Sequence, residues 1–251
     1  MRLLLTALCC GKGERGPNLR RHCEVLARAA EAGCDLAVFP EMSLTGSAVP
    51  GDRPSRLVSL GHPAVLELTR ATARTGVAAC FGIAERGPDG LPRISQLVAA
   101  GGEILGVQRK RHLGAGEETF TAATGSTVFR LADVTFGVAI CAEAGYAPAF
   151  DDAAAAGASL VLLPSAPGLY GPRRTDDASW QRGLDWWESA GLADARGHAR
   201  RLGLWIALAT QAGATMDEDF PGLAAVVDPH GEVTARLPDW REGTLVANIP
   251  C

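Results

Sequence analysis

The stretch that most limits the fold lies in the middle of the chain. Residues 135–146 read Thr-Phe-Gly-Val-Ala-Ile-Cys-Ala-Glu-Ala-Gly-Tyr, and the apolar run within them has no polar face. Such a run is typical of a central β-strand or a piece of buried helix, and its β-branched residues favour the strand. The strand is expected to end on Cys141. Because α/β proteins build sites at the carboxyl ends of central strands, Cys141 is a candidate nucleophile, although buried cysteines are commonly inert.

Strand and helix patterns alternate along the rest of the chain. Runs of β-branched and apolar residues predict strands, and apolar residues at helical spacing predict helices. Gly101-Gly102 predicts a hairpin turn. The order β-α-β-α-β, then hairpins, then β-α-β predicts an α/β fold with mixed sheets, two of them packed together with helices outside each. The expected strands cover residues 2–8, 35–39, 77–83, 94–100, 104–108, 127–131, 135–140, 160–163, 204–209, 223–227, 232–237 and 244–249, and the helices 18–32, 64–73, 147–156 and 179–202.

Composition narrows the class of protein. Of 251 residues, 47% are hydrophobic and 21% charged, which supports a large buried core. The net charge of -4 is mild and mixed, so a nucleic-acid partner, which needs a basic patch, is not expected. No apolar run approaches the roughly 18 residues that span a membrane. With no linker, repeat or low-complexity segment, residues 1–251 are expected to form a single domain.

The cysteines indicate a reducing compartment. Seven cysteines stand at irregular spacing with no C-x-x-C pair, which fits reduced thiols in a cytoplasmic protein better than disulfides or zinc. The five histidines are scattered, so no metal site is expected. The apolar start, residues 1–10, is short and lacks a small-residue cleavage site, and it therefore predicts a first strand instead of a signal peptide.

Gly11, Gly13 and Gly16 form a literal G-x-G-x-x-G after the first strand. This pattern keeps open a nucleotide-binding oxidoreductase. Pro17 and Asn18 follow the last glycine, so we expect the helix to start after the motif, where its N-terminus would not face a pyrophosphate. A strand-to-helix loop is the competing interpretation.

Three chemically active residues share one local context. Glu41, Lys110 and Cys141 each follow an apolar strand, so the three converge if those strands are neighbours. A carboxylate would accept the thiol proton and later activate water. An ammonium would lower the pKa of the thiol and stabilise an oxyanion, with the N–H of Ala142 as a second donor.

The residues around these positions resemble a known family. Phe39-Pro-Glu41 with Leu44-Thr-Gly46, Arg109-Lys-Arg-His-Leu113 with Gly116-Glu117, and Gly137-Val-Ala-Ile-Cys141 look like the three signature blocks of the nitrilase, or carbon–nitrogen hydrolase, superfamily. Later segments also match in order, so the resemblance covers essentially the whole chain. Residues 153–164 resemble the helix and strand after the nucleophile, and residues 220–231 resemble the closing hairpin.

The resemblance carries implications for fold and mechanism. It implies a four-layer α-β-β-α sandwich, a homodimer joined through the helical layer or a higher homo-oligomer, and no cofactor. It implies that Glu41 is the general base, Lys110 the oxyanion stabiliser and Cys141 the nucleophile of a thioester mechanism. A second glutamate in the loop after the lysine falls on Glu117, with Glu118 as a rival.

The resemblance leaves the substrate open. The family commonly has an aromatic residue, then Asp and Arg, after the nucleophile, whereas this chain has Ala142-Glu-Ala144, which could leave a roomier pocket. The expected partner is a small-molecule amide. Further candidate substrate contacts are Glu118, Glu143, Tyr146, Arg173 and Arg174; of these the arginine pair could hold a carboxylate, although a solvated pair is the alternative. Trp186 or Trp187 could line the pocket, with core packing as the default.

Several activities use the same residues. Nitrile-hydrolysing members tend to be longer with a C-terminal tail, so an amidase or N-carbamoyl amidohydrolase is expected. Nitrile hydrolysis and acyl transfer to an amine by the same triad stay open, as does a catalytically inactive relative that only binds. A Ser-His-Asp hydrolase is disfavoured because no G-x-S-x-G occurs.

Overall fold

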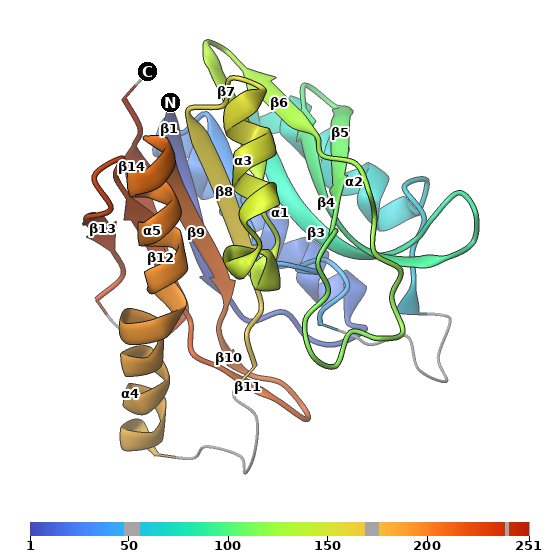
Figure 1. The fold of residues 1–251 in the computed structure, drawn as a ribbon. Coiled ribbons are helices and arrows are strands. Elements are labelled where there is room, and N and C mark those ends of the chain that lie inside the picture. Colours follow the sequence, from blue (N-terminus) through green and yellow to red (C-terminus); the bar gives the residue numbers. More distant parts are fainter. Residues whose placement is uncertain (48–55, 169–175, 239–240, 251) are drawn as a thin grey trace.

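The computed structural model describes residues 1–47, 56–168, 176–238 and 241–250 (Figure 1). It is an α/β structure, as the sequence predicts. The helical segments are α1 (Arg15–Glu31), α2 (Pro63–Thr75), a 3-10 turn η2 (Cys141–Gly145), α3 (Ala147–Ala155), α4 (Asp177–Trp186), a π-helical turn η3 (Trp187–Gly191) and α5 (Leu192–Leu202). The strands are β1 (Arg2–Leu8), β2 (Leu36–Val38), β3 (Ala78–Arg86), β4 (Pro92–Ala100), β5 (Glu103–Arg109), β6 (Val128–Leu131), β7 (Val134–Val138), β8 (Leu160–Ser165), β9 (Trp205–Gln211), β10 (Gly213–Ala214), β11 (Asp219–Phe220), β12 (Ala224–Val227), β13 (Val233–Arg236) and β14 (Gly243–Asn248).

Two mixed sheets are joined at one corner. The first has β14, β1, β2, β3, β4 and β5 in order, and the second has β13, β12, β9, β8, β7 and β6. Only the last residues of β1 and β9 pair across the join, Ala7 with Thr210 and Leu8 with Gln211. Beyond that corner β14 takes the free edge of β1, and β12 takes the free edge of β9. The sheets therefore diverge and stack face to face.

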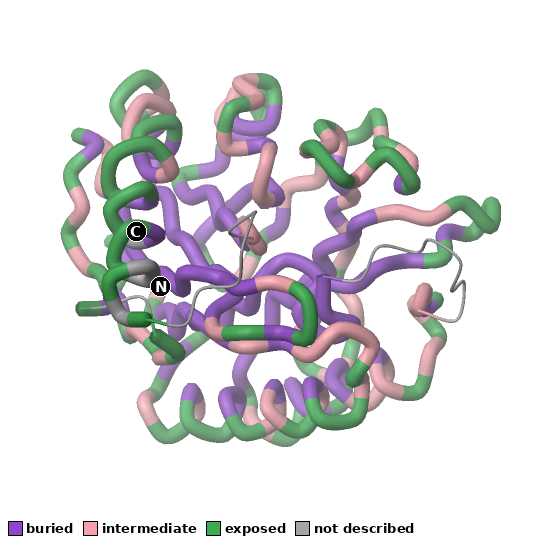
Figure 2. Tube along the Cα trace, turned by 90° about the horizontal axis from the view of Figure 1, so that it is seen from below, coloured by how far each residue is buried: buried purple, intermediate pink, exposed green. Residues whose placement is uncertain are grey.

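Side-chain alternation along the strands builds the layers. In β1, Leu3 and Leu5 point into the core between the sheets, while Leu4 points toward α1 and α2. In β8, Leu162 points between the sheets, and Val161 packs with α3 and α5. Each central strand is thus apolar on both faces, because helices cover the outside of each sheet. The result is the expected α-β-β-α sandwich, with buried strands in the middle and helices buried on one face only (Figure 2).

Helix α1 begins earlier than the sequence indicates. We expected a start near Asn18, after the glycine motif, but the helix begins at Arg15, inside it. Pro17 does not prevent this, because the first turn of a helix has no intrahelical use for an N–H. The prediction that the helix lies beyond the motif is therefore wrong.

The strand before the nucleophile ends earlier than expected. Strand β7 stops at Val138, so Cys141 does not end a strand but opens the turn η2. The chain leaves the sheet because the Ile140 N–H donates to the Glu143 carboxylate instead of to a neighbouring strand. The expected helix 179–202 is interrupted by the π-helical turn η3.

Two global expectations concern membranes and thiols. Within the described ranges no helix is long and apolar enough to cross a membrane. The six described cysteines, Cys9, Cys10, Cys23, Cys34, Cys80 and Cys141, are free thiols.

Candidate active site

Cys141 stands on a sharp turn between β7 and α3. Its backbone has φ = 50°, a left-handed conformation that costs a residue with a side chain about 1–3 kcal/mol. Reciprocal hydrogen bonds close the turn around it, because Glu143 N–H donates to the Ile140 carbonyl and Ile140 N–H donates to the Glu143 side chain. The thiol is half-buried and lines a cavity. The strained turn thus places Cys141 at the border between the cavity and the core that lies between the sheets.

Glu41 lies three residues beyond β2 and is only 1% exposed. Its turn presses against β3 at Gly82, where a Cβ would stand 2.2 Å from the Met42 nitrogen. A glycine is required there, because any side chain would push the turn away. Ser43 Oγ also accepts the Gly82 N–H, and this hydroxyl bonds to the buried ring of His22 at 2.9 Å. Helix α1 therefore braces the segment that carries Glu41.

Lys110 follows β5 directly and its side chain is fully buried. Its Nζ lies 2.7 Å from Glu41 Oε1 and 2.7 Å from Glu117 Oε1. The preceding Arg109 forms a two-pronged ion pair with buried Glu85, which fixes the end of β5. The ammonium is thus held between one carboxylate from a distant part of the chain, Glu41, and one from the loop that follows β5, Glu117.

The two candidate second glutamates separate clearly. Glu117 accepts hydrogen bonds from Lys110 through one oxygen and from the Gly114 N–H, at 2.6 Å, through the other. Glu118 is exposed and accepts a hydrogen bond from Gly116 N–H, so it does not reach the lysine. Glu117 also lines the cavity, which Glu118 does not.

Burial and charge set the protonation states in this cluster. Burial raises the pKa of the Cys141 thiol to about 12, with the charge of Glu41 adding to the effect and Lys110 opposing it. Burial also raises the pKa of Glu41, against the charge of Lys110 and a hydrogen bond from Cys141. Burial alone would lower the pKa of Lys110, but the nearby negative charges raise it. At neutral pH the thiol is therefore protonated, and its hydrogen bond with Glu41 gives its proton a direct route to that side chain.

The cavity beside Cys141 has a volume of about 870 Å³. Glycine and alanine supply 10 of the 19 residues that line it, which leaves the space open. At its outer wall Trp186 is 45% exposed, and its ring lies edge-on to Trp187 with 5.2 Å between centroids. Trp187 is itself buried and donates its ring N–H to the Pro221 carbonyl. Both tryptophans thus border the cavity, and the second also packs in the core.

Other sequence-derived candidates lie elsewhere. Glu143 is fully buried, its carboxylate accepts the backbone N–H groups of Ile140, Arg111 and His112, and it does not line the cavity. Tyr146 stacks on His112 at 5.1 Å instead of lining the cavity. The expected substrate contacts at Glu118, Glu143 and Tyr146 are therefore not brought to the site. Arg173 and Arg174 lie outside the described residues.

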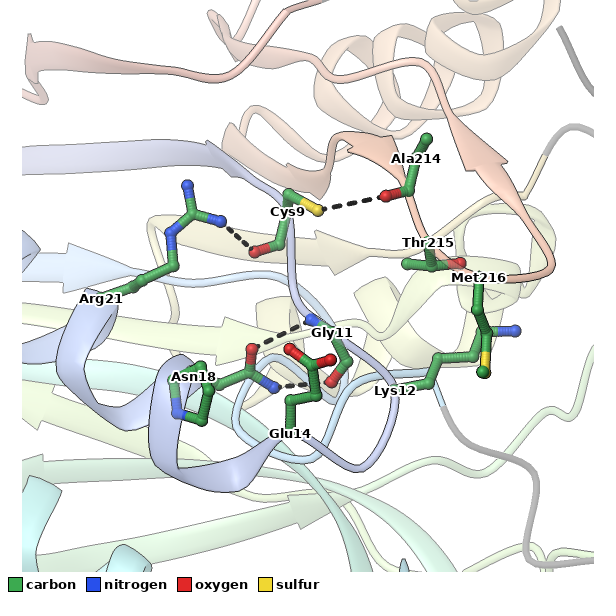
Figure 3. Close-up of a pocket in the computed structure, with 10 residues that line it drawn as sticks. Cys9, Gly11, Lys12, Glu14, Asn18, Arg21, Ala214, Thr215 and Met216 are labelled. Atoms are coloured by element: carbon green, nitrogen blue, oxygen red, sulfur yellow. Dashed lines mark hydrogen bonds between the residues drawn. The ribbon is translucent and has the colours of Figure 1, made fainter.

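The glycine motif forms a different structure from a nucleotide site. It borders a separate cavity of about 300 Å³, where Asn18 bonds to both the N–H and the carbonyl of Gly11 (Figure 3). Gly13 N–H donates to the Thr45 carbonyl, and Glu14 N–H donates to Gly11. Since these N–H groups are already used, the loop has few donors left for a pyrophosphate. The motif joins the β1 end to the loop that follows Glu41.

Some residues that shape the site were not identified from sequence. His22, Ser43 and Gly82 brace Glu41, and Arg182 and Asp194 line the outer cavity. Asn18 and His22 stand four residues apart and therefore lie on the same face of helix α1. This spacing could have identified them from the sequence as a polar pair on an otherwise apolar face. The described residues contain no group of three or more His, Cys, Asp or Glu able to hold a metal ion.

Comparison with known proteins assigns the family. The carbon–nitrogen hydrolase family model matches residues 7–251. This chain belongs to the carbon–nitrogen hydrolase family. The two-sheet sandwich of this carbon–nitrogen hydrolase is shared with an amidase from Nesterenkonia sp. AN1, with a TM-score of 0.84, 24% identity, and coverage of 100% of this chain and 93% of that one.

Sequence relatives of this carbon–nitrogen hydrolase include a synthetase and two kinds of amidase. A glutamine-dependent NAD(+) synthetase from Xylella fastidiosa is 30% identical over 225 residues, 87% of this chain and 38% of that protein. N-carbamoylputrescine amidase from Solanum tuberosum is 26% identical over 201 residues, 76% of this chain and 65% of that enzyme. A formamidase from Pseudomonas syringae is 39% identical over 87 residues, 34% of this chain and 25% of that enzyme. The matched regions thus cover less than two thirds of these relatives' own lengths.

Proposed function

We propose that this hydrolase cleaves the amide or N-carbamoyl carbon–nitrogen bond of a small molecule through a thioester on Cys141. The observation that carries the proposal is the burial of Lys110 between Glu41 and Glu117, 2.7 Å from each, beside a cavity that Cys141 also lines. A cationic donor fixed by two carboxylates is suited to hold a developing oxyanion.

The first half-reaction forms the thioester. Glu41 accepts the thiol proton as the sulfur attacks the carbonyl carbon, and a carbon–sulfur bond forms. Lys110 and the Ala142 N–H stabilise the oxyanion of the tetrahedral intermediate. The intermediate collapses, the carbon–nitrogen bond breaks, and Glu41 returns the proton to the leaving amine or ammonia. Because the pKa of Cys141 is about 12, the proton transfer to Glu41 is needed at neutral pH.

The second half-reaction releases the acid. Water enters the position that the amine has left, and Glu41 takes a proton from it as it attacks the thioester. The same oxyanion donors act again, the carbon–sulfur bond breaks, and the thiol regains its proton. Glu117 orients Lys110 throughout, since its second oxygen is fixed by the Gly114 N–H.

The sequence relatives favour amide over nitrile substrates. The names of the similar enzymes refer to N-carbamoylputrescine, formamide and glutamine. Each of these compounds contains a carbon–nitrogen bond next to a carbonyl. The E41Q mutant of one structurally similar amidase, from Nesterenkonia sp. AN1, shows Michael addition of acrylamide at its active-site cysteine. Acyl transfer to an amine uses the same thioester and is the second candidate.

A substrate screen tests the proposal. Purified protein is incubated with primary amides, N-carbamoyl amino acids and amines, and nitriles, and released ammonia and product masses are measured. We expect amide or carbamoyl turnover in the native chain and none in Cys141→Ala, with the same thermal unfolding temperature. An acid product assigns hydrolysis, whereas a new amide formed only with added amine assigns acyl transfer. Full activity in Cys141→Ala would reject the thioester mechanism.

We also propose a homodimer in the cytoplasm. The family resemblance supports the dimer, and the free thiols support a reducing compartment. Light scattering on the purified protein gives the mass: twice 26.1 kDa is expected, and 26.1 kDa would reject the dimer.

A further inference from the structure

We infer that Glu143 is a positioning residue, whose buried carboxylate holds the Cys141 turn against the segment that carries Lys110. The inference rests on the proposed roles of Cys141 and Lys110, neither of which Glu143 needs to touch. From the sequence, Glu143 is a candidate substrate contact because it follows the nucleophile. The positioning role inferred here is a different one.

The contacts of Glu143 link two separate parts of the site. Its Oε2 accepts the Ile140 N–H at 2.7 Å, and its Oε1 accepts the Arg111 N–H at 2.7 Å and the His112 N–H at 3.3 Å. Ile140 directly precedes Cys141, and Arg111 directly follows Lys110. One carboxylate therefore fixes the main chain beside the nucleophile and the main chain beside the oxyanion donor at the same time.

The nucleophile turn depends on this carboxylate. Cys141 is held at φ = 50°, and a strained residue persists only where its surroundings fix it. The bonds between Glu143 and Ile140, in both directions, close the backbone around Cys141. Without the carboxylate the buried Ile140 N–H would lack its acceptor, and the turn would gain freedom to relax.

The direction of the side chain excludes a direct part in binding. Cys141, Ala142, Ala144 and Gly145 of the same turn line the cavity, whereas Glu143 does not and is 0% exposed. A substrate in the cavity would meet its neighbours in sequence and not its carboxylate. An effect of Glu143 on turnover must therefore pass through the geometry of Cys141 and Lys110.

The chemistry of the acceptor matters, and two variants probe it. Glu143→Gln keeps the length but replaces one oxygen with an NH2 group that faces a backbone N–H. Glu143→Asp keeps both oxygens but is one methylene shorter, so it cannot reach both Ile140 and Arg111. Asp228→Asn is a matched control, because Asp228 Oδ1 likewise accepts two backbone N–H groups, from His230 and Glu232, and Asp228 does not line the cavity.

The test measures kcat, KM, thermal unfolding and the rate at which iodoacetamide alkylates Cys141. For Glu143→Gln and Glu143→Asp we expect kcat and the alkylation rate to fall by about tenfold or more, with KM within about threefold. Asp228→Asn is expected to keep both rates. Alkylation is read by peptide mass and needs no amide turnover, so it reports on the turn even if the proposed amidase activity fails.

Two results would overturn the inference. Native kcat and alkylation rates in a folded Glu143→Asp or Glu143→Gln protein would show that the carboxylate only stabilises the fold. A raised KM with unchanged kcat would assign Glu143 to substrate binding. If the glutamine variant does not fold, the aspartate variant decides between these outcomes and the expected one.

Discussion

The Lys110 ammonium lies 2.7 Å from the Glu41 carboxylate, and neither side chain is more than 2% exposed. In such a place the two charges depend on each other, because removing one partner of a buried pair leaves a charge that costs about 3–5 kcal/mol. Lys110 also contacts Glu117, so one ammonium pairs with two carboxylates at once. The same ion pair thus contributes to the stability of the fold and to the proposed reaction.

Removing either charge of this pair should impair turnover. We expect Glu41→Gln and Lys110→Met each to lower kcat by about two orders of magnitude or more, since proton transfer and oxyanion stabilisation are lost. Steady-state kinetics with the folded fraction measured by circular dichroism check this result. A folded variant that keeps half of the native kcat would contradict the assigned role.

The adjacent glutamates offer a matched comparison. Glu117→Gln should lower kcat by about a hundredfold, because Lys110 loses one of the two carboxylates that fix it. Glu118→Gln should stay within about twofold, since exposed Glu118 accepts the Gly116 N–H and does not line the cavity. The two variants differ by one position and are assayed under the same conditions. Equal effects on kcat would argue against Glu117 as the second glutamate.

Local patterns predicted much of this fold. The apolar runs marked the central strands, and the polar residues after them marked Glu41, Lys110 and Cys141, because strand identity and strand ends are local properties. Helix α1 was misplaced because Pro17 reads as a helix breaker, although the first turn tolerates it.

The direction of the Glu143 side chain and the size of the cavity could not be predicted from the sequence, because both depend on long-range packing. Glu143 looked like a substrate contact from its place after the nucleophile, but its direction is set by N–H groups of Arg111 and His112, 31 or 32 residues away. The size of the cavity depends on small residues from several remote segments, including Gly114, Ala142 and Ala190. No local pattern carries this information.

His22 should make the fold sensitive to acid. Burial lowers the pKa of His22 to about 4, so the folded protein holds the ring neutral while the unfolded chain protonates it near pH 6.5. The contribution of the neutral His22 ring to the free energy of unfolding is therefore fully present above about pH 6.5. It is lost as the pH falls toward 4, and the total loss is about 3 kcal/mol. Urea unfolding of the native chain and of His22→Gln at pH 7, 5.5 and 4.5 measures the difference. An equal loss of stability in both proteins would contradict this account.

The volume of the cavity should favour amides larger than formamide or acetamide. A site of about 870 Å³ has room for a drug-sized group beyond the reacting carbonyl. We expect kcat/KM to rise along a series from acetamide to hexanamide and phenylacetamide. Ala190→Trp narrows the outer cavity. It should lower the kcat/KM for the longest substrate, relative to the kcat/KM for the shortest, by about tenfold.

Ala193→Trp is the control for this series, because Ala193 is exposed on α5 and does not line the cavity. It should keep the native ratio of kcat/KM values. The proposed use of the outer cavity would be contradicted if the native chain had its highest kcat/KM with acetamide and Ala190→Trp did not change that preference.

The most direct measurement is the mass of the protein during turnover. Reactions of the native chain and of Glu41→Gln with the best amide are quenched in acid, and the peptide containing Cys141 is analysed by mass spectrometry. We predict an increase equal to the acyl group on Cys141, which hydroxylamine removes and which Cys141→Ala lacks. Turnover with no adduct on Cys141, together with native activity in Cys141→Ala, would contradict the mechanism.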